Sequence, residues 1–404
     1  MTRVEPGVFL SDESVYAYEG TGMDARVIGA FAPSPVFIDP KELEAKYKVN
    51  RKQYTAIAFI VHRFKPNGGQ WTGLTDAPQP SPIAYDTAAE LYCVIRVKNP
   101  NGQTEYFLGN PGDNLPTSAN VGGGDQQLIR WPAQYPALAF SWRAITPKYK
   151  DYSNKKTGAP FVFDKHDYTE SEVSQNRWIY QLDGNQVGIS RWTVEVTIET
   201  HPFGPPGKDA REETPGDQRI ANKVKRILRM GNYPNDYLKW ASTYLNVAWT
   251  FGANPGQYDN YVGTDCAKLC CAAYRKIVPN TPEASANTLV GNARTGTNPY
   301  IGVVGALDNK KLADNVPRNQ LSPGDLIVLR KAAEGAMFHH AVIYIGEKRD
   351  GTLDGSEKII MANWARGQTN HYRVTIIDLS SVLGAVGGAA PYDTFVVLRW
   401  KFPP

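Results

Sequence analysis

The chain has 404 residues, more than one average domain requires, so we expect two domains that each bury a core. Apolar residues make up 42% and charged residues 21%, which is the composition of a folded protein and excludes a disordered chain. The net charge of +4 arises from 44 basic and 40 acidic residues without a long basic run, so nucleic acid is not an expected partner.

The sequence shows neither a membrane span nor a secretory signal. No stretch reaches the roughly 18 to 20 apolar residues that cross a bilayer, so we expect no transmembrane segment. Residues 1–16 lack the apolar core of a secretory signal. Because a signal is cut from a mature protein, the compartment stays open, as does the oligomeric state.

Four cysteines are too few for a disulfide scaffold, and three of them, Cys266, Cys270 and Cys271, are too close along the chain to bridge well. C-x3-C-C is not a usual zinc-ligand spacing, and no second Cys/His pair stands at a standard distance. We therefore expect no metal and no cofactor.

Short strand-like runs broken by turn residues fill the segment from 15 to 200, with a period near 2, for example at 54–64 and 90–100. One helix is expected near 40–49. The pattern predicts a β-rich N-terminal domain, a sandwich or a barrel.

Two hairpins are predicted within this domain. Asn-Gly in 99–103 predicts a tight turn between the strand before it and the strand at 104–110. The DGN sequence at 183–185 predicts a second hairpin between the runs on either side of it.

Residues 202–216 are rich in Pro, Gly and charge and have no periodicity, which indicates a linker. The sequence therefore predicts a β-rich accessory domain at 1–201 and a second domain at 217–404. An opening helix is predicted for the second domain, with Asp217 as its N-cap and Gly231 as its stop. Its apolar residues recur at helical spacing: Ile220, Val224, Ile227 and Leu228.

The segment 246–277 combines a short apolar piece, a Gly-rich loop and a helix that we expect to begin at Cys266. Asp265 is a good N-cap residue. In the first turn, free backbone N–H groups and the helix dipole favour a thiolate, so Cys266 is a candidate nucleophile. Cys270 and Cys271 lie further inside the apolar helix and are predicted to be core residues.

A thiol nucleophile needs a proton acceptor, and histidine titrates in the right range. The second domain has three, His339, His340 and His371. Strands are expected at 326–329 and 339–345. Because side chains alternate along a strand, only one of the two adjacent histidines can face the cysteine helix.

Three blocks resemble, in the same order, signature blocks of NlpC-type cell-wall peptidases. Those enzymes show G-x-D-C-S-G-L, P-G-D-L and H-V-G-I-Y-x-G, where this chain has GTDCAKL at 263–269, LSPGDLIVL at 321–329 and HAVIYIG at 340–346. The resemblance covers roughly residues 217 to 400. It implies an α+β fold with a papain-like hydrolase domain, Cys266 as nucleophile and His340 as base, which leaves His339 as a surface residue.

The chain departs from the family pattern after the nucleophile, where Ala267 and Lys268 replace Ser-Gly. Trp249 appears in place of an upstream tyrosine, and its indole N–H can still donate towards an oxyanion. We expect Trp249 and Asp265 to line the substrate site.

The family's third catalytic residue is a polar residue on the strand after the base, where it orients the imidazole. In that strand Asn363 is the only uncharged polar side chain able to do so. The match is inexact, because Met361 or Ala362 falls near the family's position. His371 is the alternative.

The resemblance implies a cysteine peptidase or amidase that cleaves an amide bond through a thioester. Its partner would be a peptide or peptidoglycan fragment of the bacterial cell wall, which implies an extracytoplasmic location. Two other hypotheses stay open. One is an inactive papain-like domain in a binding or structural protein, and the other is an acyltransferase or amidase with a different substrate.

Large aromatic residues of the first domain are expected mainly in strands and cores. A sugar-stacking platform is the alternative, with the loops at 71–73 and 130–135 as first candidates. The tryptophans concerned are Trp71, Trp131, Trp142, Trp178 and Trp192.

Overall fold

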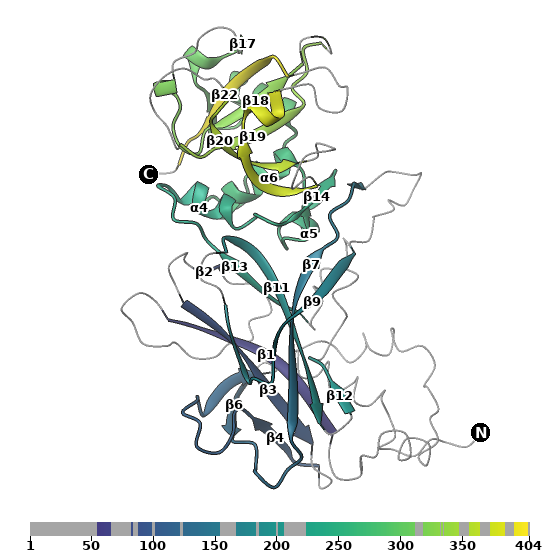
Figure 1. Cartoon of the computed structure of the whole chain (residues 1–404). Coiled ribbons are helices and arrows are strands. Elements are labelled where there is room, and N and C mark those ends of the chain that lie inside the picture. The colour runs from purple at the N-terminus through teal and green to yellow at the C-terminus, as the bar shows by residue number, and fades with distance from the viewer. Residues whose placement is uncertain are drawn as a thin grey trace, which may run out of the picture.

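The computed structural model describes residues 55–65, 82–83, 88–98, 102–121, 124–153, 167–182, 186–198, 201–205, 224–311, 318–331, 333, 335–346, 355–363, 372–383 and 392–402. This part of the chain is mixed α+β and rich in strands, as predicted. Two six-stranded sheets come first, and a ten-stranded sheet with the helices follows (Figure 1). The helix expected near 40–49 and the loop at 71–73 lie outside the described residues.

The first sheet has the order β1-β3-β4-β6-β5, with β10 added on β3. Its strands are β1 (Thr55–Lys65), β3 (Ala88–Lys98), β4 (Thr104–Phe107), β5 (Ser118–Val121), β6 (Gly124–Ile129) and β10 (Ile179–Gln181). Lys98 pairs with Thr104 across the Asn-Gly turn, so the first predicted hairpin is confirmed.

The second sheet has the order β2-β13-β11-β7-β9, with β12 added on β11. Its strands are β2 (Pro82–Ile83), β7 (Leu138–Pro147), β9 (Tyr168–Gln175), β11 (Gly188–Ile198), β12 (His201–Phe203) and β13 (Lys225–Arg229). The second predicted hairpin is wrong, because β10 pairs with β3 of the first sheet whereas β11 pairs with β7. The chain therefore passes from the first sheet to the second between β10 and β11.

These two sheets share one hydrophobic core, as in a sandwich. Four of the five tryptophans considered for a sugar platform are buried, and all four belong to this core: Trp131, Trp142, Trp178 and Trp192. The loop at 130–135 therefore offers no exposed indole as a sugar platform.

The helix predicted after residue 217 is wrong where the structure describes it, because Lys225–Arg229 forms strand β13. Its register pairs Arg226 with Arg191 of β11. Neighbouring side chains of β13 belong to different cores. Ile227 packs in the core of the sandwich, and Leu228 packs in the core of the region that follows. A strand is normally recognised by apolar and polar residues that alternate with period 2. Because β13 is buried on both faces, it lacks this alternation, and the spacing of its apolar residues resembles that of a helix.

The third sheet has the order β15-β14-β21-β20-β19-β18-β22-β16, with β17 on β22 and β8 on β14. Its strands are β8 (Tyr152–Ser153), β14 (Ala248–Phe251), β15 (Gly263–Thr264), β16 (Ile301–Val303), β17 (Lys310–Lys311), β18 (Leu326–Arg330), β19 (His340–Tyr344), β20 (Lys358–Asn363), β21 (Arg373–Asp378) and β22 (Thr394–Trp400). The accompanying helices are α4 (Asp236–Ser242), α5 (Pro255–Tyr258), α6 (Cys266–Arg275), α7 (Ala286–Thr295), α8 (Ser380–Leu383) and the 3-10 turns η1 (Gly305–Leu307) and η3 (Arg318–Gln320).

Helix α6 packs on one face of this sheet, where Ala341 and Ile343 of β19 join its core. The opposite face forms a separate core that includes Val342 and Tyr344. Strand β19 is therefore buried on both sides, and each of its side chains belongs to one core or the other.

The predicted boundary at 202–216 stays a prediction, yet two ladders join residues on either side of it. Strand β8 pairs with β14, and β13 pairs with β11. The two regions are therefore tied by backbone hydrogen bonds as well as by the chain.

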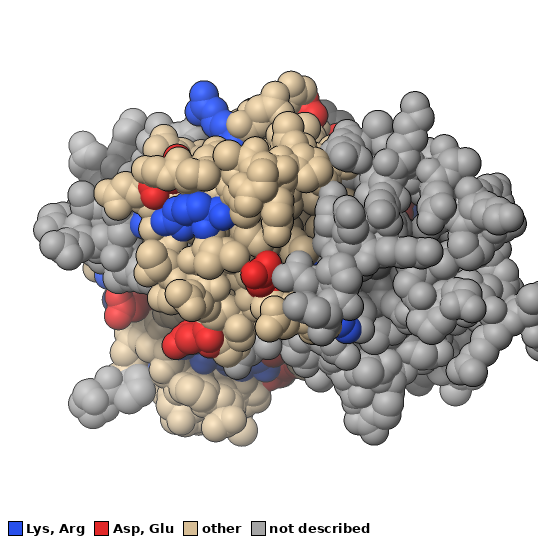
Figure 2. All heavy atoms as spheres, turned by 90° about the horizontal axis from the view of Figure 1, so that it is seen from below, with Lys and Arg blue, Asp and Glu red and all other residues tan. Residues whose placement is uncertain are grey.

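Figure 2 shows one end of the molecule, where the described basic and acidic side chains are mixed rather than gathered by sign. Within the described ranges, no helix has the length and apolarity that crossing a bilayer demands.

Gly188 stands at the junction of the second sheet and α4, with φ +100, and a Cβ there would lie 2.6 Å from Leu245 Cβ. Gly102, in the β3–β4 turn, has a similar φ of +83 with nothing within 4 Å. We expect Gly188→Ala to lower the free energy of unfolding by about 3 kcal/mol, because it adds a clash to backbone strain. Gly102→Ala should lower the free energy of unfolding by only about 1 kcal/mol, because it adds backbone strain without a clash. Equal decreases for the two variants in urea unfolding would contradict the clash at Gly188.

Candidate active site

Helix α6 begins at Cys266, as predicted, and its N-cap is Asp265. The Asp265 carboxylate accepts a hydrogen bond of 3.0 Å from the backbone N–H of Lys268. It also takes bonds from the backbone amides of Gly252 and Ala253, which oppose the rise that burial causes in its pKa. One carboxylate thus fixes both the helix start and the loop beside it.

The turn before α6 is held from the N-terminal sheets. Arg191 on β11 is buried and donates from Nη2 to the carbonyl of Tyr261 at 2.9 Å. Arg226 on β13 donates to the carbonyl of Asn260. Tyr261 adopts a left-handed conformation with φ 57, so these contacts hold a turn that its own backbone preferences disfavour.

The Cys266 thiol lies beside the first residues of β19 and is partly exposed. Its Sγ is 4.0 Å from the carbonyl oxygen of His339. Burial, with a contribution from the Asp265 charge, raises the pKa of Cys266 to about 12, although the backbone amides of Ala341 and Ala267 oppose the rise. In this arrangement Cys266 is a neutral thiol at pH 7.

His340 is the first residue of β19 and is 1% exposed. Its ring stacks on Tyr392, with centroids 5.9 Å apart, and it shares the strand face of Val342 and Tyr344. Burial lowers the pKa of His340 to about 4, so the imidazole is neutral at pH 7. Its buried Nε2 makes no hydrogen bond with any described residue.

The Cys266 sulfur contacts backbone atoms next to His340 in sequence, and it makes no hydrogen bond to the His340 ring. The 339 carbonyl and the 341 amide, which flank His340, both reach the Cys266 sulfur. The ring itself turns to the Tyr392 side, away from the face on which α6 packs. The imidazole and the thiol therefore lie towards different faces of β19, and no direct thiol–imidazole bond forms in this arrangement.

Asn363 ends β20 and is fully buried. The β19–β20 ladder pairs Tyr344 with Ile359 and Ile343 with Ile360. The described pairing ends there, but alternation along β20 from Ile360 and Ala362 on the α6 side puts Asn363 on the opposite face, the face of His340. His371 lies outside the described residues.

The remaining predicted residues have distinct environments. His339 is exposed and precedes β19. Trp249 on β14 is partly buried, pairs with Thr264 just before the N-cap, and lies near the rings of Phe251 and Tyr372. Trp249 therefore borders the start of α6, whereas the Asp265 carboxylate is engaged by backbone amides.

Sequence reasoning missed three features near the site. Tyr392, which stacks on His340, follows it by 52 residues with no motif to announce it. Lys268, the departure after the nucleophile, donates to Glu283 at 2.6 Å and so ties α6 to the loop before α7. Phe251 is 62% exposed beside the loop that Asp265 holds, an apolar position that alternation along β14 could have indicated.

The other cysteines have the places expected of core residues. Cys270 and Cys271 are buried on α6, and the four cysteines of the chain are all free. No cluster of three or more His, Cys, Asp or Glu side chains with metal-binding geometry occurs in the part of the chain that the structure describes.

Residues 246–375 match the family model described as the NlpC/P60 family. The match includes the Cys266 helix, β18, β19 and β20, and it covers less than half of the chain. A search of curated proteins and a search of solved structures found no match.

The neutral burial of His340 predicts an acid-dependent stability. Its folded pKa of about 4 lies below the ordinary value of about 6.5, so the unfolded chain binds more protons between these values. The stability that His340 contributes is thus present above pH 6.5 and is lost as pH falls towards 4. From pH 7 to 5 the free energy of unfolding should fall by about 2 kcal/mol more than in His340→Gln, measured by urea unfolding. His339→Gln, at an exposed position, should behave as wild type, and parallel pH profiles for wild type and His340→Gln would contradict the burial.

The Asp265 charge raises the pKa of the Cys266 thiol, so removing it should increase thiol reactivity. Asparagine caps helices as well as aspartate, so Asp265→Asn keeps α6 while deleting the charge. We expect faster alkylation of Cys266 by iodoacetamide near pH 8, with the labelled site identified by mass. Asp265→Ala, which also removes the cap, should cost about 1 kcal/mol of stability. Unchanged or slower labelling of Asp265→Asn would show that the charge does not act on the thiol.

Proposed function

Since residues 246–375 form an NlpC/P60 family domain, we propose that this protein is a cysteine hydrolase that cleaves an amide bond in peptides of the bacterial cell wall. Members of this family are generally cysteine peptidases acting on such peptides. The observation that carries the proposal is the position of Cys266, the first residue of a capped helix, beside the strand that begins with His340.

In the proposed mechanism, His340 takes the proton of the Cys266 thiol as the sulfur attacks the amide carbonyl carbon. The neutral state of His340 supports its function as base, because only a neutral imidazole can accept a proton. The carbonyl π electrons move to oxygen, and a tetrahedral intermediate forms.

The developing oxyanion would be stabilised at the start of α6, where backbone N–H groups beginning with that of Cys266 have no partner inside the helix. Trp249 is the proposed side-chain donor, since its strand runs beside Thr264. The C–N bond then breaks, the amine leaves with the proton from His340, and a thioester remains on Cys266. Water activated by His340 cleaves the thioester and restores the thiol.

Asn363 and Asp265 are proposed as positioning residues. Asn363 ends β20 on the sheet face that also carries His340, from which an amide could orient the imidazole. The Asp265 carboxylate keeps the α6 start and the 252–253 loop in place.

A second hypothesis is favoured by one observation. The thiol and imidazole make no hydrogen bond to each other, and both are neutral, which also suits a domain that binds peptides without cleaving them. Apo enzymes often form the catalytic hydrogen bond only with substrate, so hydrolysis remains the proposal that an assay must decide.

The test is digestion of purified cell-wall peptides, with products identified by mass. We expect the intact protein to cleave and Cys266→Ala to lose cleavage, because the other three cysteines are buried. Cys271→Ala is the matched control, since Cys271 lies on the same helix but is buried in its core, and it should retain cleavage. Asn363→Ala should lower kcat more than it raises KM.

Either of two results would overturn this proposal. Cleavage that survives in Cys266→Ala would exclude the nucleophile. Binding of cell-wall peptides by the wild type without any cleavage would favour the second hypothesis instead.

A further inference from the structure

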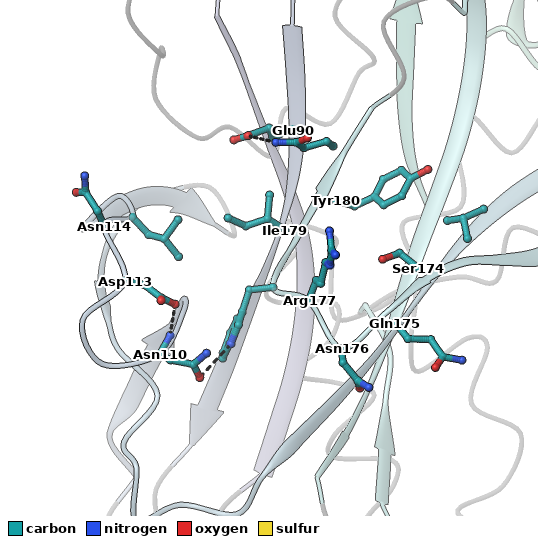
Figure 3. Close-up of a pocket in the computed structure, with 14 residues that line it drawn as sticks. Glu90, Asn110, Asp113, Asn114, Ser174, Gln175, Asn176, Arg177, Ile179 and Tyr180 are labelled. Carbon is teal, nitrogen blue, oxygen red and sulfur yellow. Dashed lines mark hydrogen bonds between the residues drawn. The ribbon is translucent and has the colours of Figure 1, made fainter.

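The N-terminal sheets contain an open hollow of about 890 Å³ (Figure 3). Its walls come from Glu90 on β3, the loop 110–115 after β4, and the segment 173–181 from the end of β9 through β10. None of the lining residues belongs to the NlpC/P60 match at 246–375. The hollow is therefore a feature separate from the cysteine site.

The loop wall is held by a set of exposed and partly buried hydrogen bonds. The backbone N–H of Asn110 donates to the Asp113 carboxylate at 2.6 Å. The Arg130 guanidinium donates to four carbonyl oxygens of this loop and its flanks, those of Leu108, Asp113, Leu115 and Pro116. The loop thus keeps its shape without a ligand.

The opposite wall is fixed through its backbone. The N–H of Asn176 donates to the β7 backbone at 2.9 Å, and Trp142 Nε1 donates to the carbonyl of Arg177 at 2.8 Å. Trp178 Nε1 reaches Asn110 Oδ1 at 3.4 Å and so joins the two walls. Both walls are preorganised, which lowers the entropy cost of binding.

Four polar side chains that line the hollow take no part in these hydrogen bonds: Asn114, Ser174, Asn176 and Arg177. None of them makes a side-chain hydrogen bond or ion pair with another described residue. Figure 3 shows Asn114 on one side, Ser174 and Asn176 on the other, and Arg177 between them. The site therefore offers hydrogen-bonding groups that the fold itself does not use.

The chemistry of these groups indicates the ligand. Amides and hydroxyls both donate and accept, which suits a ligand whose own groups do both. The Glu90 carboxylate is already paired with Arg63 at 3.1 Å, and Asp113 is held by its loop. Among the described lining residues, a polyanion would therefore meet two acidic side chains and a single unpaired cation, Arg177. The partly exposed Ile179 and Tyr180 add an apolar patch.

We propose that this hollow binds a saccharide of uncharged sugars, held through its hydroxyl and amide groups. That the saccharide comes from a cell-wall glycan strand rests on the proposed function, whereas saccharide binding itself does not. The N-terminal sheets would then hold the glycan while the cysteine site acts on attached peptides.

The test uses the full chain with Cys266→Ala, so that binding is measured without cleavage. Oligomers of N-acetylglucosamine and peptide-free cell-wall glycan are titrated by calorimetry. Asn176→Gly removes the amide but tolerates the positive φ of 55 at this position, so the fold is preserved. We expect Asn176→Gly and Asn114→Ala each to weaken binding about fivefold to tenfold, the loss of one or two hydrogen bonds.

Gln127→Ala is the control, because Gln127 is exposed on β6 of the same sheet but does not line the hollow. It should bind as tightly as the parent. Absence of binding to every saccharide at millimolar concentration, binding of an acidic peptide only, or equal binding by all variants would overturn the proposal. Binding of the oligomers but not of the cell-wall glycan would keep the saccharide site and remove its cell-wall source. Because peptide cleavage is assayed separately with intact Cys266, failure here leaves the proposed hydrolase function standing.

Discussion

The Asp265 carboxylate is the interaction on which the arrangement of the site depends. It accepts backbone hydrogen bonds from Lys268 within α6 and from Gly252 and Ala253 in the preceding loop. Because these donors come from two segments, one side chain sets where the helix begins and where the loop lies. The same negative charge opposes ionisation of the adjacent thiol. Structural order at the helix start is thus gained at the expense of thiol acidity.

The N-terminal sheets extend this scaffold beneath the site. Arg191 and Arg226 would be costly to bury without acceptors, and the carbonyls of Asn260 and Tyr261 supply them. Ile189 and Leu228 reach from the second sheet into the core around α6. The family match begins at residue 246, but the packed unit around the nucleophile also includes residues upstream of it. This physical coupling explains why composition marks a boundary at 202–216 more sharply than the hydrogen-bond pattern does.

Local features of the site could be predicted because they depend on neighbours in sequence. The N-cap at Asp265, the helix from Cys266 and the strands around His340 follow from capping chemistry and alternation. Strand β13 could not be predicted, because its five residues are all buried and lack polar alternation. The stacking of Tyr392 on His340 and the switch of sheet after β10 depend on contacts between distant segments, which no local pattern records. For the same reason, sequence alternation separated the two histidines but could not say which face α6 would cover.

The opposite pKa changes of Cys266 and His340 constrain the proton transfer that the proposed mechanism requires. Burial raises the pKa of Cys266 and lowers the pKa of His340, so both changes favour the neutral thiol and the neutral imidazole over the ion pair. The described arrangement therefore favours an uncharged thiol and an uncharged imidazole at rest. For hydrolysis, proton transfer must accompany attack on the carbonyl, when the negative charge moves to an oxygen that the α6 amides can stabilise. The proposed role of His340 as base also requires its ring to leave the Tyr392 side, where it packs in the described arrangement.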